Sequence, residues 1–277
     1  MPIYCSSTLR MTPTDSTGSF PADTEGAIYY DDSESLLKHY DGTNWGRVSR
    51  ELTYGVTPGY GPYTVDDYTK LLLHCNGSDD SSTFTDDGDT GHSPAAQNGA
   101  VLDTAYKKTG TASGLFDGVD QYVSVPDHAD WNFGTGNWTL DFWIRFDSLT
   151  GEQHFFGQFP SNFWIIGKRP TTDKLYIQFD MVSNPETVYE MTNAPSLSAG
   201  TWYHFAFSRN GSSALIFING VSQAMTTSSG GFSTYDTGDS TNDLRVGYGG
   251  DKYMNGWMDE IRVSKGIARW TENFEVY

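Results

Sequence analysis

The stretch that decides the fold of this chain is Trp138-Thr-Leu-Asp-Phe-Trp-Ile-Arg-Phe146. Its apolar side chains recur at every second position from Leu140 to Phe146, and Asp141 and Arg145 fall between them. Because side chains along a β-strand point alternately to the two faces of a sheet, this period of two predicts a half-buried strand.

The same alternation recurs on both sides of that stretch. Asn219-Gly220 separates two of the predicted strands, and this pair is the strongest short signal for a hairpin. Aromatic residues make up 15% of the chain and it contains 30 glycines, which suits sheets joined by turns. We therefore predict an all-β, antiparallel β-sandwich without a long helix. Its further strands are predicted at Lys70–Cys75, Tyr122–Val125, Lys174–Asp180, Trp202–Arg209, Ala214–Ile218, Val221–Met225, Leu244–Val246 and Trp257–Val263.

Three segments of the chain differ in character. Residues 1–52 are polar with short strand-like pieces and are predicted to form a small β-hairpin module. Residues 53–68 carry Gly and Pro at short intervals, which indicates a linker. Residues 69–277 hold the regular strands and turns of the sandwich.

The charge of the chain restricts its partners. The chain has 17 basic and 35 acidic residues, a formal net charge of −18. This field repels nucleic acid and anionic membranes, and no apolar run approaches the ~18 residues of a membrane span. We expect neither nucleic-acid binding nor membrane insertion. Many exposed carboxylates can serve calcium binding, or they can simply keep the protein soluble. The composition does not decide between these two roles.

The cysteines and the N-terminus bear on the cellular compartment. Cys5 and Cys75 are the two cysteines, and two free thiols are the preferred interpretation. Residues 1–10 lack the basic and apolar regions of a signal peptide, so we expect release by a route such as lysis, or an intracellular location.

Four local patterns occur in a specific order between Leu115 and Thr271. They are Leu115–Pro126, Asn137–Ile144, Thr201–Phe207 followed by Phe217–Val221, and Asn255–Val263 followed by Ser264–Thr271. Together they resemble the concanavalin A-like, laminin-G-like lectin fold, and the resemblance covers nearly all of residues 69–277. It implies a jelly-roll sandwich that binds carbohydrate, with the ligand left unspecified.

The segment Gly26–Val48 resembles a short hairpin module of bacteriophage tail and virion fibre proteins. This resemblance implies a virion structural protein, either a fibre or a capsid or tail decoration protein, at the virion surface. Its partners would be other virion proteins, and it would form a homotrimer because so small a hairpin needs a packing partner. The alternative is a bacterial domain with an unrelated hairpin.

The sequence lacks the catalytic motifs of several enzyme classes, so we do not expect an enzyme. Glucanases that share this sandwich carry a Glu-x-Asp motif on one strand, and the chain contains no Glu-x-Asp. It also has no Gly-x-Ser-x-Gly, no phosphate-binding loop and no His-Glu-x-x-His. Three alternatives to a glycan-binding virion protein stay open: a virion decoration or cement protein without sugar binding, a polysaccharide depolymerase, and a cellular adhesin domain.

A calcium site is the cofactor that the lectin resemblance implies. The matching positions are Asp117 or Asp120, together with Asp259. Strict alternation places Asp259 on the same face as Ile261 and Val263, where a buried carboxylate needs a metal, an arginine or backbone amides. Turn chemistry alone also explains Asp117, because Asp-Gly favours turns.

Three other features of the sequence have a structural interpretation. The acidic loop Asp86–His92 lacks the calcium-loop pattern and is interpreted as a solvated turn, and His204 is interpreted as a packed or surface residue. The aromatic stretch Phe155–Trp164 is expected to be core or a subunit contact.

The predicted ligand surface is the Gly-rich loop Gly247–Asn255. Sugars stack on aromatic rings while polar groups bind their hydroxyls, and loops at the ends of a sandwich commonly bind ligands. The predicted binding residues are Tyr248, Asp251, Tyr253 and Asn255. The alternative is a turn with solvent-exposed tyrosines.

Overall fold

The computed structural model describes residues 28–31, 36–40, 45–47, 63–160, 163–181, 184–227 and 239–276. The chain divides into two compact units, Met1–Thr57 and Pro58–Tyr277. The first unit contains a three-stranded antiparallel sheet, formed by β1 (Ile28–Asp31), β2 (Leu36–Tyr40) and β3 (Trp45–Arg47). Cys5 lies outside the described residues.

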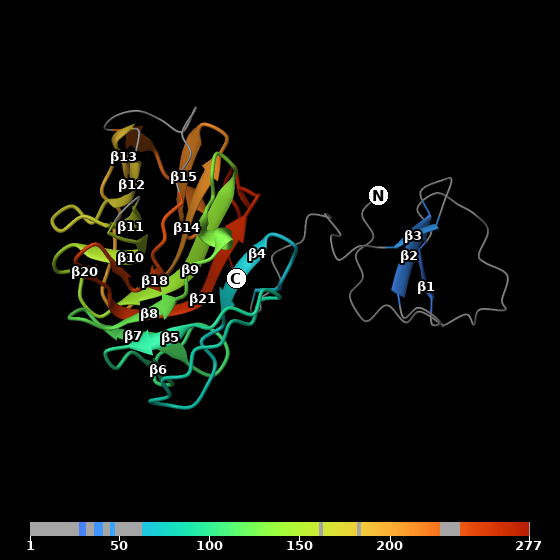
Figure 1. Ribbon diagram of the computed structural model, residues 1–277, viewed down its shortest axis with the longest axis horizontal. Coiled ribbons are helices and arrows are strands. Elements are labelled where there is room, and N and C mark those ends of the chain that lie inside the picture. Colours follow the sequence, from blue (N-terminus) through green and yellow to red (C-terminus); the bar gives the residue numbers. More distant parts are fainter. Residues whose placement is uncertain are drawn as a thin grey trace. The chain divides into compact units, whose positions relative to one another are not determined.

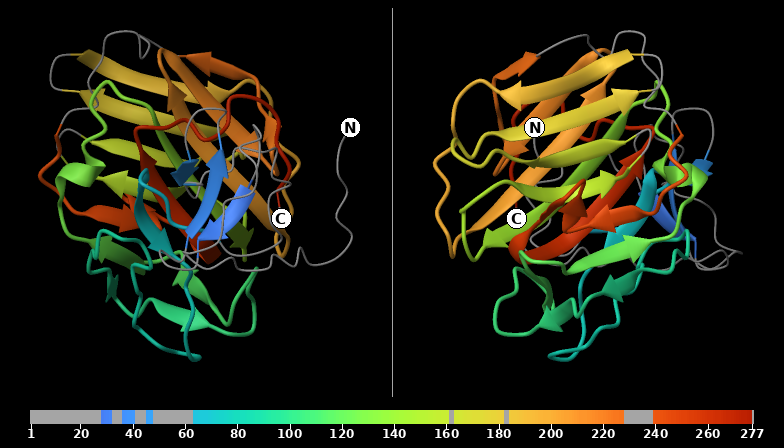
Figure 2. Two further views of the ribbon diagram at one scale, coloured as in Figure 1. Left: turned by 90° about the vertical axis from the view of Figure 1, so that its right-hand side faces the viewer. Right: turned by 60° about the vertical axis from the view of Figure 1, so that its left-hand side comes forward.

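The second unit is a sandwich of two antiparallel sheets, which Figure 1 shows as two facing layers and Figure 2 shows from two further directions. Sheet I has the order β17-β13-β12-β11-β10-β18-β8-β5. Its strands are β5 (Ala95–Gln97), β8 (Tyr122–Val125), β10 (Gln153–Gln158), β11 (Trp164–Lys168), β12 (Leu175–Met181), β13 (Asn184–Met191), β17 (Met225–Thr227) and β18 (Leu244–Val246).

Sheet II has the order β16-β15-β14-β9-β21-β7-β6, and β4 pairs with the second half of β21. Its strands are β4 (Thr69–Leu73), β6 (Val101–Asp103), β7 (Ser113–Asp117), β9 (Trp138–Phe146), β14 (Trp202–Asn210), β15 (Ser213–Ile218), β16 (Val221–Ser222) and β21 (Asn255–Lys265). The all-β sandwich that the sequence predicted is confirmed. Within the described ranges, one short 3-10 turn, η1 (Ala129–Trp131), is the helical element, and no described helix is long and apolar enough to cross a membrane.

The core lies between the two sheets and is rich in phenylalanine. The inward residues of β9 meet those of β10 and β14, so that the rings of Phe142, Phe155 and Phe205 pack against one another at centroid distances of 5.7–6.0 Å. All three are fully buried. The aromatic stretch Phe155–Trp164 therefore contributes to the core, as one of its two interpretations predicted.

The predicted turn at Asn219-Gly220 is confirmed, and the strand predicted after it is partly wrong. Asn219 and Gly220 have φ values of 49° and 76°, which a type I′ turn requires, and they join β15 to β16. Val221–Met225 is not one strand, because β16 ends at Ser222 and Met225 begins β17 in the opposite sheet.

The face predicted for Asp259 is wrong because β21 contains a β-bulge. The pairing of β21 with β9 shifts register between Asp259 and Arg262, and Glu260 within the bulge has a φ of 49°. Asp259 pairs with Trp143 on the outer face of sheet II, whereas Ile261 and Val263 point into the core.

Residues 63–68, which belong to the linker that the Gly/Pro pattern predicted, pack on the outer face of sheet II. The hydroxyl of Tyr63 lies 2.6 Å from His204 Nε2, and Asp66 accepts two hydrogen bonds from the guanidinium of Arg269. His204 is 2% exposed and lies on that face, which confirms its interpretation as a packed histidine.

Candidate functional site

The predicted ligand loop forms a small hairpin, with β19 (Tyr248–Gly249) paired to β20 (Lys252–Tyr253). At its base, Gly247 N–H donates to the carbonyl of Phe155 and Met254 N–H donates to the carbonyl of Gly247. A Cβ at Gly157 would lie 3.0 Å from Gly249 Cα, so the absence of side chains at both glycines lets the hairpin lie directly on the outer face of sheet I.

Three tyrosines cluster at this hairpin. The ring centroids of Tyr248 and Tyr253 are 4.5 Å apart, and the ring of Tyr122 lies 5.1 Å from Tyr248 and 6.4 Å from Tyr253. Tyr122 reaches the hairpin from the start of β8, where it shares the outer face with Ser124. All three tyrosines are half-buried, so part of each ring is open to solvent. We call Tyr122, Tyr248 and Tyr253 the tyrosine cluster.

Arg245 on β18 supports this cluster. Its guanidinium carbon is 5.1 Å from the ring centroid of Tyr248 and 5.8 Å from that of Tyr122, both within cation–π range. Its Nε atom is buried and has no hydrogen-bond partner in the described part of the chain. The cation therefore faces the aromatic rings and orients them.

Polar groups surround the tyrosine cluster. Lys252 Nζ lies 2.6 Å from Asp251 Oδ2, and the hydrogen bond from Lys252 holds the pKa of Asp251 below its ordinary value. The side chain of Asp251 is 78% exposed, so its carboxylate is available to a ligand. Partial burial, with the neighbouring Tyr248 and Asp120, raises the pKa of Tyr253, so its hydroxyl stays protonated at neutral pH.

A buried network fixes the hairpin from beneath. His154 contacts the carbonyl oxygen of Gly249 through Nδ1, and its Nε2 lies 2.6 Å from the hydroxyl of Tyr176. The same hydroxyl also lies 2.9 Å from Glu152 Oε1. Burial lowers the pKa of His154 and raises that of Tyr176, so both groups are neutral near pH 7. Neutral groups suit a supporting role.

Two carboxylates of this region are bound by one arginine. Arg169 donates from Nε to Glu190 at 2.6 Å and from Nη1 to Glu152 at 3.4 Å. An acid–base pair for glycoside cleavage needs one carboxylate free to attack or to activate water. In this arrangement both carboxylates form ion pairs with Arg169.

The structure brings most of the predicted site residues to one end of the sandwich. Asp117 on β7 pairs with Asn255 on β21. The next residue, Gly118, also lies against Asn255, because a Cβ added to Gly118 would be only 2.7 Å from the Cβ of Asn255. Asp120 is close enough to Tyr253 for its charge to act there. Asp117, Asp120 and Asn255 therefore adjoin the tyrosine cluster.

Asp259 is separate from this group. It lies four residues beyond Asn255 on β21, which corresponds to roughly 13 Å along a strand. Its carboxylate accepts the amides of Lys108, Thr109 and Glu260 at 2.8–3.0 Å, and burial raises its pKa to about 7. Backbone amides are thus the partners of this buried carboxylate.

The proposed calcium ligands do not fit one shared ion. Asp117 Oδ1 accepts the backbone amides of Val119, Asp120 and Gln121, which is turn chemistry. A calcium ion needs six to eight oxygen ligands at 2.3–2.6 Å, and Asp259 is too distant to join Asp117 and Asp120.

Sequence reasoning missed Tyr122 and Arg245. Tyr122 precedes Val123 and Val125, which point inward, so alternation alone places it on the outer face of β8. Arg245 is likewise outward between Leu244 and Val246. What the sequence did not provide was the pairing of β8 with β18, which brings the two residues together beside the hairpin.

The fold is that of a lectin-type β-sandwich. The family model described as "Concanavalin A-like lectin/glucanases superfamily" matches residues 117–272, more than half of the 277 residues. The chain belongs to this family. No curated protein matches the sequence.

Solved structures with the same fold are distant in sequence. Domain 4 of AbnA, a GH43 extracellular arabinanase from Geobacillus stearothermophilus in complex with arabinotriose, is 16% identical with a TM-score of 0.51, over 72% of this chain and 94% of that one. Botulinum neurotoxin type C, whose uptake into cells depends on two ganglioside molecules, is 12% identical with a TM-score of 0.52, over 73% of this chain and 49% of that one.

A third similar structure is the binding domain of botulinum neurotoxin DC in complex with SialylT. It is 14% identical with a TM-score of 0.53, over 73% of this chain and 49% of that one. The chain thus spans about half the length of the neurotoxin chains that it matches. At these identities the similarity shows the shared fold alone.

Proposed function

We propose that the Pro58–Tyr277 unit is a non-catalytic carbohydrate-binding domain whose ligand surface is the tyrosine cluster. The observation that carries this proposal is the grouping of Tyr122, Tyr248 and Tyr253 on the outer face of sheet I. Aromatic rings held rigidly and partly open to solvent offer apolar area for the C–H face of a sugar ring at low entropic cost.

The polar rim of the cluster supplies the hydrogen bonds that a sugar needs. Asp251 offers an acceptor, Lys252 a donor, and the protonated hydroxyl of Tyr253 can donate. Asp120 and Asn255 extend this rim on the side of the β7–β8 turn. The bound arabinotriose and SialylT in two structures with this fold support a carbohydrate as the ligand class.

The cellular setting of this domain is proposed from the N-terminal resemblance. We place the chain at the surface of a bacteriophage virion, as a fibre or as a capsid or tail decoration protein. The Met1–Thr57 unit would attach it to other virion proteins and form a homotrimer. Three weak sugar sites in one trimer would bind a host or environmental glycan surface with useful avidity.

The experiment that tests the proposal is a glycan array probed with the purified full chain, in calcium and in EDTA. Tyr122→Ala and Tyr248→Ala test the cluster. Tyr106→Ala is the matched control, because Tyr106 is a 44% exposed tyrosine that packs edge-on against Trp257 away from the cluster. We expect discrete glycan hits that both cluster variants lose and the control retains.

The array also separates the alternatives. Hits that disappear in EDTA would support calcium at Asp117 and Asp120, whereas hits that persist would make the surface metal-independent. The absence of hits in both buffers would contradict sugar binding and favour a virion decoration role. Shortening of a polysaccharide by the wild-type chain would instead indicate a depolymerase.

A further inference from the structure

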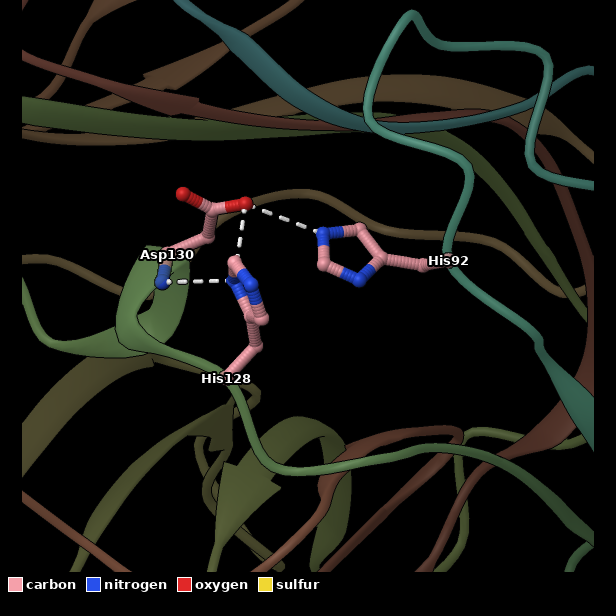
Figure 3. A group of neighbouring side chains, drawn as sticks. All are labelled: His92, His128 and Asp130. Atoms are coloured by element: carbon pink, nitrogen blue, oxygen red, sulfur yellow. Dashed lines mark hydrogen bonds and ion pairs between the residues drawn. The ribbon is translucent and has the colours of Figure 1, made fainter.

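Three potential metal ligands meet at the other end of β8 from Tyr122. His92 is the last residue of the acidic loop Asp86–His92. His128 is the N-cap of η1, and Asp130 lies within it. One ligand atom from each of the three side chains lies within 4.8 Å of the other two. Figure 3 shows the two imidazoles and the carboxylate directed toward one another.

The shared atom of this group is Asp130 Oδ2. It lies 3.0 Å from His92 Nε2 and 3.0 Å from His128 Nδ1. Ligands bound to a tetrahedral zinc ion at about 2.0–2.2 Å are about 3.3 Å apart. The two oxygen–nitrogen distances would widen by about 0.3 Å around an ion, and the two imidazole nitrogens lie within 4.8 Å of each other.

His128 Nδ1 makes two contacts with Asp130. This nitrogen accepts the backbone N–H of Asp130 at 3.2 Å, and it lies 3.0 Å from Asp130 Oδ2. A metal ion at this junction would take the Nδ1 lone pair in place of the long amide contact and would bind the carboxylate at the same time.

The surrounding structure holds the ligands in place. Asp86 accepts the backbone N–H groups of Leu72, Gly88 and His92, which fixes the loop that carries His92. The imidazole of His92 is 8% exposed and packs on the buried Trp131 at a centroid distance of 4.6 Å. Such preorganisation lowers the cost of binding an ion.

We propose that His92, His128 and Asp130 form a binding site for a divalent transition metal of the zinc type. Imidazole ligands select zinc and its neighbours over calcium, which prefers oxygen. The side chain of His128 is 53% exposed, so the fourth position of a tetrahedral ion is open to water. The ion would tie the Asp86–His92 loop to the turn that follows β8.

The test is calorimetric titration of the full chain with ZnCl₂ near pH 7.5, after removal of metals with EDTA and dialysis. The variants are His128→Ala and Asp130→Asn. Asp127→Asn is the matched control, because Asp127 is an exposed carboxylate next to His128 but outside the group. We expect one zinc ion per chain, with affinity reduced at least about tenfold in both variants and unchanged in the control.

Circular dichroism checks that each variant is folded. His128→Ala alone decides the matter if Asp130→Asn does not fold, since His128 is largely exposed. A wild-type chain that binds no zinc overturns the proposal. So does zinc binding that His128→Ala leaves unchanged, because the ion would then sit elsewhere in the chain.

Discussion

At the scale of single residues, Asp141 and Arg262 form a buried ion pair beneath Tyr63. Arg262 donates to both carboxylate oxygens at 2.9 and 3.1 Å, and Tyr63 covers its guanidinium at 3.9 Å. Burial alone would raise the pKa of Asp141, but the charge of Arg262 and the hydrogen bond from His204 hold it well below its ordinary value. Both partners of the pair are therefore charged near neutral pH.

Removing one partner of this pair should be costly. We expect Asp141→Leu to lower the free energy of unfolding by about 3–5 kcal/mol, because Arg262 is left as a buried, uncompensated charge. The double variant with Arg262→Met should recover most of that loss, since no buried charge is left. Urea unfolding of both variants measures the difference, and a double variant as unstable as the single one would contradict this account.

At the scale of elements, the bulge in β21 explains where sequence reasoning failed. Alternation along β9 predicted its bounds and faces correctly, because that strand pairs without a register shift along β14. In β21 the partner changes from β7 to β4, and the bulge at Glu260 accommodates the change. A positive φ at a glutamate has no signature in a single sequence, so the face of Asp259 was not predictable.

The Asp66–Arg269 pair links the segment before β4 to the segment after β21. Arg269 donates to both oxygens of Asp66 at 2.8 Å. Although burial opposes the charge, the hydrogen bond and charge of Arg269 lower the pKa of Asp66 to about 2. An aspartate in the unfolded chain has a pKa of about 3.9. The pair therefore stabilises the fold above pH 4, and this contribution is lost as the pH falls toward 2.

Asp66→Asn tests this pH dependence. We expect the variant to have a lower free energy of unfolding than the wild type at pH 7. This difference in free energy, the stability gap, should narrow as the pH falls from about 4 to about 2. Asp67→Asn, which changes the exposed neighbouring carboxylate, should follow the wild type at every pH. Unfolding by urea at pH 7, 4 and 2.5 provides the comparison. A gap that stays constant over this range would show that the charge of Asp66 contributes nothing.

At the scale of the whole molecule, the candidate site is assembled from distant parts of the chain. A Gly-rich loop with two tyrosines was recognisable locally, so Tyr248 and Tyr253 were predicted. Tyr122 and Arg245 join them only through strand pairing. His92 and Asp130 are likewise 38 residues apart in sequence and meet only in the folded chain. Sequence thus predicts the strands and single loops, whereas contacts between loops depend on the topology.

The division of the chain into two units carries a prediction about assembly. We expect the full chain to form a trimer through the Met1–Thr57 unit, and a chain of residues 58–277 to be monomeric and still folded. Light scattering coupled to size-exclusion chromatography distinguishes these states at micromolar concentration. A monomeric full chain would contradict the fibre-like assembly, although it would leave the sugar-binding surface unaffected.

The central claim is that the tyrosine cluster binds a sugar. Calorimetric titration with the strongest glycan from the array tests it most directly, with wild type, Tyr122→Ala and the control Tyr106→Ala compared in one buffer. Our account predicts at least about a tenfold loss of affinity for Tyr122→Ala, which is 1.4 kcal/mol, and no change for Tyr106→Ala. Equal affinities for wild type and Tyr122→Ala, with both variants folded, would contradict it.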